Sequence, residues 1–544
     1  MSSCAAAPLD ARRWDALALV AIALGILLRT RGIGSEALWF DEVMSVEHLA
    51  GSTWQDVKGV LTRVDPPLYY AFLWAWIPLA GTSELALRLP SLLCGVAALV
   101  LIWRCGRAWF SPAVGAAAAA LLAANPLAIL YAQEARFYEP LLLCGLAACA
   151  AWDRLLLQDG GKRELRLYAL AAAALFYLHF MGVLLVAAHA LFLVLGGPSR
   201  EARRRGLRAL VAAALLIGPY LLGALYLYLG ERAGHREWIQ RSGGTPATSQ
   251  ILATLASFTG MQGPQLRVQR PWIELPALLL VGFARRRMLL ALGARERPLL
   301  ERQRLCLHGL SVAIPPLLLA LLSQSKSIYL DRYLLAGLPS AVLLVAYGLG
   351  RGGEVRALRT SALVLATSAA VLLPFVTCWS SLRKADWPAA LRALAGEALP
   401  GDVLVVDGPV DRPERPSEGI DITTYHYYRR ALEAERGAAL PIRVVTVPFD
   451  LLRRGEWSGV EEHERAELER ARVVERELLA SEASTIWVAA TLDPWRTPWP
   501  DRALEQTTLW KQLLTRAGIG RASSYPRLEL WRFARGNAPS ASGE

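Results

Sequence analysis

The chain has 544 residues, of which 54% are hydrophobic and only 19% are charged. Its mean hydropathy is +0.31, whereas a soluble protein of this length carries more charge and a lower mean hydropathy. Long apolar runs recur through about the first 380 residues. The sequence therefore predicts a polytopic membrane protein, and it excludes a disordered chain, a collagen-like chain and a disulfide-stapled domain.

The net charge of +12 is unevenly distributed along the chain. Residues 383–544 contain 23 Lys and Arg against 25 Asp and Glu, so the whole positive excess belongs to the part with the apolar runs. There the basic residues cluster in short loops, as expected of loops on the cytoplasmic side of a membrane. This pattern excludes a nucleic-acid-binding face.

The N-terminal part is expected to cross the membrane once and then form a long outer loop. The first apolar run, 14–28, follows two arginines and predicts an uncleaved signal anchor with its N-terminus inside. The first outer loop, 29–87, contains an amphipathic helix that we expect to end near residue 62. Residues 66–80 are short, aromatic and begin with two prolines, so they are predicted to lie at the outer interface as a juxtamembrane helix.

Ten further spans are then expected, which gives about eleven in all. They lie at 88–103, 113–130, 139–152, 166–180, 182–196, 208–228, 272–284, 305–322, 333–349 and 360–378. This arrangement places the basic clusters at 162–163, 203–205 and 285–287 inside, as the positive-inside rule requires. If residues 66–80 crossed the membrane, all of these clusters would lie outside.

Residues 381–544 contain no further apolar span and predict a soluble α/β domain, separate from a membrane domain of residues 1–380. Strands are expected at 402–406, 443–447, 485–490 and 528–533, and a charged helix at 461–479. Because the number of spans is odd, this domain is expected on the outer, periplasmic or extracellular, side of the inner (cell) membrane.

Polar side chains collect at the predicted outer ends of the spans, and such groups beside apolar segments mark function by default. They are Asp41, Glu42, Asp65, Arg88, Gln133, Glu134, Arg136, Tyr138, His179, Lys326, Asp331, Arg332 and Tyr333. Carboxylates and cations on one face suit a charged substrate and acid–base chemistry.

Simpler structural roles stay open for individual members of this set. Asp41 is suited to cap the helix that follows it, Glu42 to stabilise the first turn of that helix, and Arg88 to snorkel to the interface. A lone His179 is more often a hydrogen-bonded core residue than a ligand. No His, Cys or Glu cluster with metal-ligand spacing occurs, so the sequence predicts no metal site and no cofactor.

Six motifs in the same region resemble the GT-C class of polytopic glycosyltransferases. In order they are LWFDEVMS, DPPLYY, SELALRLPS, NPLAILYAQEARFYEPL, YLHF and LDRYLLAGLPS. More narrowly, they are similar to the bacterial branch related to dolichyl-phosphate-mannose protein mannosyltransferases and to the lipid A aminoarabinose transferase. With the start of the C-terminal domain, the resemblance covers about residues 14–410.

The resemblance implies an inverting enzyme that takes a sugar from a polyprenyl-phosphate carrier and passes it to a hydroxyl acceptor at the outer membrane face. In that class an acidic residue of the first outer loop acts as the catalytic base, and the matching residue here is Asp41. Glu134 lies where relatives hold a second acidic residue. The sequence agrees with a lipid-borne donor, since no Gly-rich phosphate loop precedes a predicted helix.

The leaving phosphate requires cations or hydrogen-bond donors. Arg136 is the first candidate, followed by Lys326 and Arg332, while Tyr138 and Tyr333 are suited to donate to the phosphate or to stack on the sugar. Substrate-orienting roles are assigned to Glu42, Asp65, His179 and Arg88.

One residue departs from the pattern of the branch. The aminoarabinose transferase has a phosphate-contacting lysine just before its Pro-Pro pair, and the matching residue here is Asp65, of opposite charge. Either phosphate binding is arranged differently here, or Asp65 has another role, such as binding sugar hydroxyls or a divalent cation.

Two other functions compete with the transferase. A lipid-linked sugar flippase predicts charged residues at mid-depth and an internal repeat, and the sequence shows sparse mid-span charge and no repeat. A non-catalytic scaffold leaves the carboxylates and arginines of the outer face unexplained. The acceptor and the sugar stay open.

Overall fold

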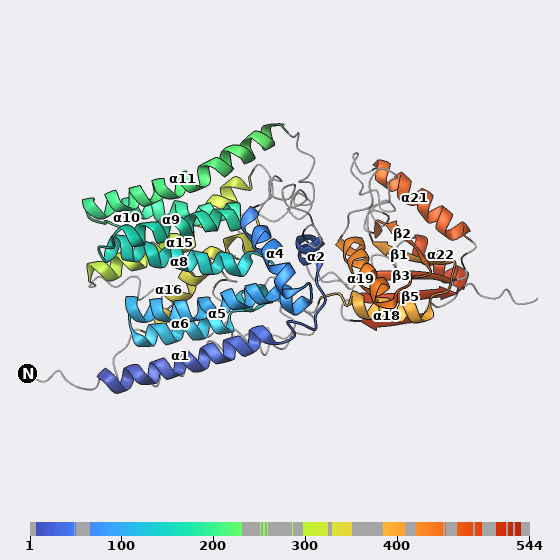
Figure 1. The fold of residues 1–544 in the computed structure, drawn as a ribbon, viewed down its shortest axis with the longest axis horizontal. Coiled ribbons are helices and arrows are strands. Elements are labelled where there is room, and N and C mark those ends of the chain that lie inside the picture. Colours follow the sequence, from blue (N-terminus) through green and yellow to red (C-terminus); the bar gives the residue numbers. More distant parts are fainter. Residues whose placement is uncertain are drawn as a thin grey trace, which may run out of the picture. The chain divides into compact units, whose positions relative to one another are not determined.

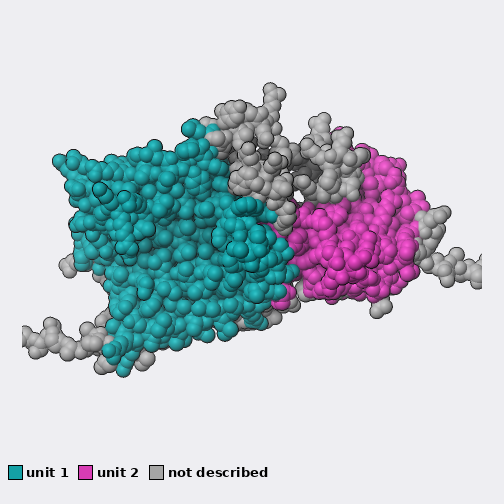
Figure 2. Space-filling model, in the orientation of Figure 1, with its two compact units in different colours: residues 1–34, 48–378 teal, residues 35–47, 379–544 magenta. Residues whose placement is uncertain are grey.

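The computed structural model describes residues 7–47, 66–230, 298–324, 329–350, 384–407, 420–449, 465–481, 485–491, 508–517, 521–525 and 528–534, with isolated positions between them. The chain divides into two compact units (Figure 2). Unit 1 contains residues 1–34 and 48–378, and unit 2 contains residues 35–47 and 379–544. Residues 35–47, which the sequence assigns to the first outer loop, thus group with the C-terminal part of the chain.

Unit 1 is a bundle of helices (Figure 1). They are α1 (Ala7–Thr30), α4 (Pro67–Ala80), α5 (Glu84–Trp109), α6 (Pro112–Ala124), α7 (Pro126–Ala132), α8 (Tyr138–Leu157), α9 (Lys162–Leu178), η1 (Phe180–Gly182), α10 (Val183–Leu195), α11 (Arg200–Gly230), α15 (Leu299–Leu322), η2 (Asp331–Gly337) and α16 (Leu338–Gly350).

The bundle is that of a multi-pass membrane protein. Within the described ranges, five helical segments are long and apolar enough to cross a membrane, and the pair α6–α7 makes a sixth if it is one broken span. The spans expected at 272–284 and 360–378 lie outside the described residues. The total of eleven spans therefore stays a prediction.

The span predicted at 113–130 is broken in the middle. Helices α6 and α7 meet at an angle of 61°, and the break falls at Asn125-Pro126. The Asn125 side chain accepts hydrogen bonds from the backbone N–H groups of Leu127 and Ala128, so it caps α7. Pro126 takes the first helical position, where its missing N–H costs nothing.

Small residues let the helices of unit 1 approach closely, as is common in membrane bundles. A Cβ atom on Gly145 of α8 would lie 2.4 Å from the carbonyl oxygen of Ala336 in η2. A Cβ atom on Gly115 of α6 would lie 2.7 Å from the carbonyl oxygen of Trp103 in α5. Gly145 therefore fixes η2 against α8, and these two elements carry the aromatic and cationic residues described below.

Polar contacts join helix ends that lie on one face of unit 1, which we call the basic face. Arg107 near the end of α5 pairs with Asp15 of α1 at 3.1 Å. At the start of α11, Arg205 contacts Asp159 after α8 at 2.7 Å. Gln303 in the first turns of α15 donates to the carbonyl oxygen of Gly197 after α10.

A buried ion pair strengthens the same face. The guanidinium of Arg304 on α15 binds both carboxylate oxygens of Asp153 on α8, at 2.7 and 3.3 Å, and donates to the carbonyl oxygen of Trp109 at the end of α5. Both side chains are almost fully buried. Because each partner is paired and hydrogen-bonded, the two charges are tolerated in the interior.

Unit 2 contains a five-stranded mixed sheet with the order β2-β1-β3-β5-β4. Strands β1 (Asp402–Asp407), β2 (Ile442–Val447) and β3 (Thr485–Thr491) are parallel, and β5 (Leu528–Ala534) joins β3 and β4 (Arg521–Tyr525) by antiparallel pairing. The described helices are α2 (Phe40–Glu47), α18 (Trp387–Glu397), α19 (Ile420–Arg436), α21 (Arg465–Ala480) and α22 (Thr508–Ala517).

All four strands expected from the sequence are present within one or two residues, and the charged helix expected at 461–479 is α21. Strand β4 was not expected. The residues that form it, RASSY, contain one aromatic and no β-branched side chain, so their pairing with β5 is imposed by the sheet rather than by local propensity. The amphipathic helix of the outer loop begins as α2, and residues 50–62 lie outside the described part.

Candidate functional site

The acidic pair of the first motif, Asp41 and Glu42, lies in the first turn of α2 in unit 2. The backbone N–H groups of Glu42 and Val43 donate to the carbonyl oxygen of Trp39, so Trp39 is the N-cap. The Glu42 carboxylate accepts a hydrogen bond from the Trp39 backbone N–H at 3.2 Å. A Glu at the third helical position does the same in a capping box. Asp41 therefore lies inside the helix, and Glu42 performs the capping.

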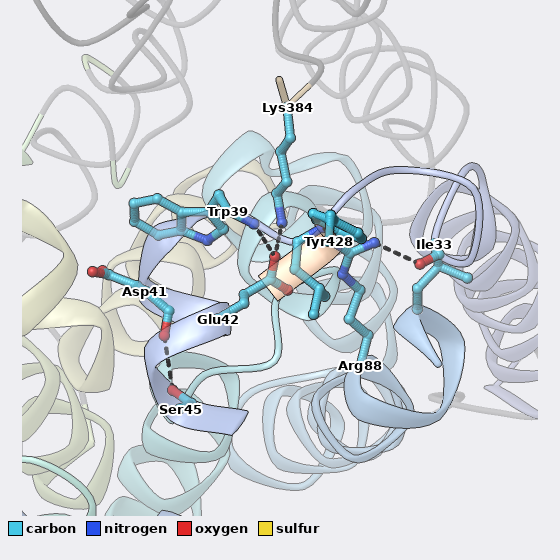
Figure 3. A network of polar contacts seen from close by, with 9 residues as sticks. Ile33, Trp39, Asp41, Glu42, Ser45, Arg88, Lys384 and Tyr428 are labelled. Atoms are coloured by element: carbon cyan, nitrogen blue, oxygen red, sulfur yellow. Dashed lines mark hydrogen bonds and ion pairs between the residues drawn. The ribbon is translucent and has the colours of Figure 1, made fainter. Parts of the chain in front are cut away.

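Glu42 is also one half of a buried ion pair. Its Oε2 atom lies 2.6 Å from Nζ of Lys384, and its side chain is 0% exposed (Figure 3). Asp41 is half-buried, and its carboxylate points away from the Glu42–Lys384 pair (Figure 3). Its backbone carbonyl accepts a hydrogen bond from the Ser45 hydroxyl at 2.8 Å.

Helix α19 holds this motif in place within unit 2. The backbone N–H of Leu38 donates to the Tyr428 hydroxyl at 2.5 Å, and Arg430 pairs with Glu47. On the same helix, burial raises the pKa of Tyr425 to about 12, while nearby Arg429 opposes the rise. The segment around Asp41 is therefore fixed at both ends of α2.

In unit 1, the turn between α7 and α8 carries three of the predicted site residues. Glu134 is buried, Arg136 is half-buried, and Tyr138 begins α8. The turn is tied down by the backbone N–H of Arg136, which donates to the carbonyl oxygen of Glu134 at 2.8 Å. The hydroxyl of Ser91 on α5 donates to the carbonyl oxygen of Arg136 at 3.1 Å.

Arg136 lies among aromatic rings. Its Nη1 donates to the hydroxyl of Tyr70 on α4 at 3.3 Å, and its Cζ lies 4.8 Å from the ring centroid of Phe137 and 6.0 Å from that of Tyr138. These rings hold the guanidinium by cation–π attraction. Arg136 is therefore positioned by α4 and α8 together.

A second guanidinium reaches the same tyrosine from η2. The Cζ atom of Arg332 lies 5.6 Å from the ring centroid of Tyr138 and 5.9 Å from that of Tyr333. The backbone N–H of Arg332 donates to the Asp331 carboxylate at 2.8 Å. Tyr138 is thus shared by both arginines, at the N-terminus of α8, where the helix dipole also favours an anion.

His179, between α9 and η1, completes this group. Its ring centroid lies 4.3 Å from that of Tyr333 and 5.1 Å from that of Phe137. Its Nδ1 accepts the backbone N–H of Met181 at 3.2 Å, so the ring proton is on Nε2, which can donate to a ligand. We call Arg136, Tyr138, His179, Arg332 and Tyr333 the cation–aromatic cluster.

The structure thus brings together five of the predicted residues, with Glu134 two residues from Arg136. Arg88 is 1% exposed and donates to the carbonyl oxygen of Ile33 at 2.8 Å (Figure 3), so it does not snorkel to water. Asp41 and Glu42 belong to unit 2, and their convergence with the cluster stays a prediction. Asp65 and Lys326 lie outside the described residues.

Two residues of this region were missed by the sequence analysis. Tyr70 and Phe137 both contact Arg136. Tyr70 lies in the DPPLYY motif, and its place in that motif was the available signal. Phe137 adjoins Arg136, but an isolated aromatic residue beside a span reads as part of the core.

Gln133, another residue of the outer-face set, has a structural role. Its Nε2 lies 2.8–3.1 Å from the carbonyl oxygens of Leu28, Arg29 and Arg31 at the C-terminal end of α1. The last carbonyls of a helix receive no N–H from a following turn, and the Gln133 amide supplies donors at this end of α1. Among the described residues, no group of three or more His, Cys, Asp and Glu side chains is placed to hold a metal ion.

The fold is similar to that of solved glycosyltransferases of the GT-C class, as the six motifs predicted. Residues 64–222 match the family described as dolichyl-phosphate-mannose-protein mannosyltransferase. No curated protein matches the chain by sequence.

Solved structures resemble the chain over nearly its whole length. ArnT from Cupriavidus metallidurans bound to undecaprenyl phosphate has a TM-score of 0.54 at 13% identity, and the match covers 97% of this chain and 99% of that one. Its apo state gives 0.52 at 13% identity, with coverage of 96% and 99%. The apo oligosaccharyltransferase of Archaeoglobus fulgidus gives 0.50 at 12% identity, with coverage of 88% and 69%.

Proposed function

We propose that this protein transfers a sugar from a polyprenyl-phosphate carrier to a hydroxyl acceptor at the outer face of the membrane. The observation that carries the proposal is the cation–aromatic cluster, in which two guanidinium groups share one tyrosine at the ends of apolar helices. The similar fold of ArnT, solved with undecaprenyl phosphate, supports a polyprenyl phosphate as the carrier.

The cluster suits the phosphate of such a donor. Arg136 and Arg332 offer guanidinium N–H donors, which bind phosphate through charge-assisted hydrogen bonds. Tyr333, which is half-buried, supplies a hydroxyl donor and a flat ring on which a sugar stacks, whereas the Tyr138 ring is 1% exposed and holds the two guanidinium groups. The negative charge that develops on the phosphate as its bond to the sugar breaks is stabilised by these fixed cations.

Asp41 is the proposed base. Its carboxylate takes the proton of the acceptor hydroxyl as that oxygen forms a bond to the anomeric carbon. The bond between the anomeric carbon and the phosphate oxygen breaks, and polyprenyl phosphate leaves as an anion from the opposite side, with inversion. Glu134 is proposed to orient hydroxyl groups of the sugar or the acceptor.

The test is release of free undecaprenyl phosphate from undecaprenyl-phosphate sugars by the purified protein in lipid nanodiscs with candidate acceptors. Asp41→Asn should lower turnover by about 10²–10⁴-fold, the usual contribution of a general base, while undecaprenyl phosphate still binds. Glu47→Gln, a change in the same helix, is the matched control and should keep turnover. Full turnover by Asp41→Asn would remove the assignment of the base.

Arg136→Gln and Arg332→Gln separate the transferase from a flippase. In a transferase both changes should weaken binding of undecaprenyl phosphate and raise the KM for the donor. Movement of a fluorescent lipid-linked sugar across the bilayer without release of undecaprenyl phosphate would instead support the flippase.

A further inference from the structure

The interior of unit 1 contains an uninterrupted chain of polar side chains from five helices, which we call the interior polar chain. The Tyr168 hydroxyl lies 3.2 Å from Nδ1 of His189, and Nε2 of His189 lies 3.4 Å from Sγ of Cys149. The Cys149 thiol lies 3.8 Å from Oγ of Ser340, which lies 3.0 Å from Nδ1 of His308. The three middle groups, His189, Cys149 and Ser340, each contact a polar neighbour on both sides.

All five members are at most 1% exposed. Each can act both as donor and as acceptor, so one direction of donation from Tyr168 to His308 satisfies every contact. Aromatic packing fixes the histidines further, since Trp152 stacks on His189 at 5.7 Å and Trp109 lies 5.1 Å from His308. The chain is thus a defined arrangement, and losing one link leaves buried polar groups unpaired.

The elements joined by this chain also carry the cation–aromatic cluster. Cys149 lies eleven residues after Tyr138 in α8, and Tyr168 lies eleven residues before His179 at the end of α9. At a rise of about 1.5 Å per residue, both members lie about 16 Å from the cluster along their helices.

The remaining links follow the same pattern. Ser340 lies seven residues after Tyr333, at the start of α16, which continues directly from η2. His189 lies ten residues after His179, in α10, which continues directly from η1. Apart from the α7–α8 turn, every element that contributes a side chain to the cluster is therefore also held by the interior polar chain, at a point deeper in the bundle.

We propose that the interior polar chain is a positioning device that sets the relative register of α8, α9, α10 and η2–α16. It thereby holds Tyr138, His179, Arg332 and Tyr333 as one preformed site. The device itself is read from the contacts within unit 1. Its effect on donor binding rests on the proposed function.

The first experiment needs no ligand. Hydrogen–deuterium exchange of the full chain in lipid nanodiscs is compared for wild type, Cys149→Ala, Cys149→Ser and Cys144→Ala. Cys149→Ala breaks the chain at its centre, Cys149→Ser keeps a donor and an acceptor there, and Cys144→Ala removes a thiol of the same helix that has no place in the chain.

Cys149→Ala should speed the exchange of backbone amides in residues 331–337 and 179–182 by about threefold to tenfold, because interhelical hydrogen bonds in membranes are worth roughly this factor. Cys149→Ser should restore slow exchange, and Cys144→Ala should match wild type. Ser340→Ala breaks the next link and should reproduce Cys149→Ala. Unchanged exchange at these segments, or an equal rise in α5 and α6, would overturn the proposal.

The second experiment measures binding of undecaprenyl phosphate to the same variants well below their melting temperatures. Affinity should fall about threefold to tenfold in Cys149→Ala and Ser340→Ala, and return in Cys149→Ser. If wild type does not bind undecaprenyl phosphate, the proposed function fails while the exchange result still decides the device. If wild type binds and both chain-breaking variants bind equally well, the link from the device to the donor is wrong.

Discussion

Two adjacent carboxylates in the first turn of α2 have different surroundings. Glu42 is fully buried, caps its helix through the Trp39 backbone N–H, and pairs with Lys384. The Asp41 carboxylate points away from that pair, and the Asp41 backbone carbonyl accepts the Ser45 hydroxyl. Glu42 thus stabilises the segment that presents Asp41, which leaves Asp41 the better candidate for proton transfer.

We expect Lys384→Met to destabilise unit 2 by about 3–5 kcal/mol, because it leaves the buried carboxylate of Glu42 without its cation. The double variant Glu42→Gln/Lys384→Met should recover most of the loss, since a Gln amide oxygen still accepts the Trp39 N–H. Thermal melting of the full protein in detergent measures both. Arg430→Met, which removes an exposed pair with Glu47, should cost no more than about 1 kcal/mol. A double variant no more stable than Lys384→Met would contradict the role of the pair.

For single residues, the sequence predicted which side chains lie close together better than it predicted the role of each one. Arg136, Tyr138, His179, Arg332 and Tyr333 were selected as polar groups at span ends, and they do lie together. The partner of Glu42 is 342 residues away in the sequence, so no local pattern distinguishes Glu42 from Asp41. Burial of this kind is decided by tertiary packing, which residue type and spacing do not reveal.

At the scale of elements, the broken span α6–α7 depends on an arginine from another helix. Arg29 of α1 is fully buried and donates from Nη1 to the carbonyl oxygen of Ala123 at 3.1 Å and from Nη2 to that of Leu122 at 3.0 Å. These carbonyls lie at the end of α6, beside the break at Pro126, and that of Leu122 also accepts the backbone N–H of Asn125 at 3.3 Å. The guanidinium therefore caps α6 from the side.

Arg29→Met should destabilise unit 1 by about 1–3 kcal/mol, because the carbonyl of Ala123 loses its guanidinium donor while that of Leu122 keeps the backbone N–H of Asn125. The side-chain volume is nearly kept, so the loss reports the guanidinium, including its charge near the buried carboxylate of Glu139, rather than a cavity. The same change at Arg13, which is exposed on the same helix, serves as the control and should leave the melting temperature in detergent unchanged. Equal melting temperatures for the two variants would show that the bonds to α6 add nothing.

The break itself was readable in principle from the sequence. Asn-Pro is a turn signal, but the apolar run continues on both sides of it, and hydropathy alone extends the span through it. Strand β4 was not readable from the sequence, because its residues have little strand propensity and become a strand only by pairing with β5. Apolar periodicity thus located the long helices and the buried strands, while caps and edges required the three-dimensional neighbours.

For the whole molecule, the contacts of the basic face test the assignment of helix directions. The starts of α1, α11 and α15 and the ends of α5, α8 and α10 are joined there by Arg107–Asp15, Arg205–Asp159, Gln303–Gly197 and Arg304–Asp153. Lys162 and Arg163 begin α9, directly after Asp159. The basic clusters at 162–163 and 203–205 therefore share one face, whereas the cation–aromatic cluster lies at the opposite ends of the same helices.

The positive-inside rule then predicts which face is cytoplasmic. A cysteine introduced at Lys162, in the basic face, should react with a membrane-impermeant maleimide only after intact cells are opened. A cysteine at Thr82, which is exposed just before α5, should react in intact cells. The parent protein, with its own cysteines only, gives the background in each case.

Helix α5 runs from Glu84, near Thr82, to Arg107 at the basic face. Labelling at both positions from the same side would therefore mean that α5 does not cross. Labelling of Lys162→Cys alone in intact cells would place the cluster, and with it the proposed chemistry, on the cytoplasmic side.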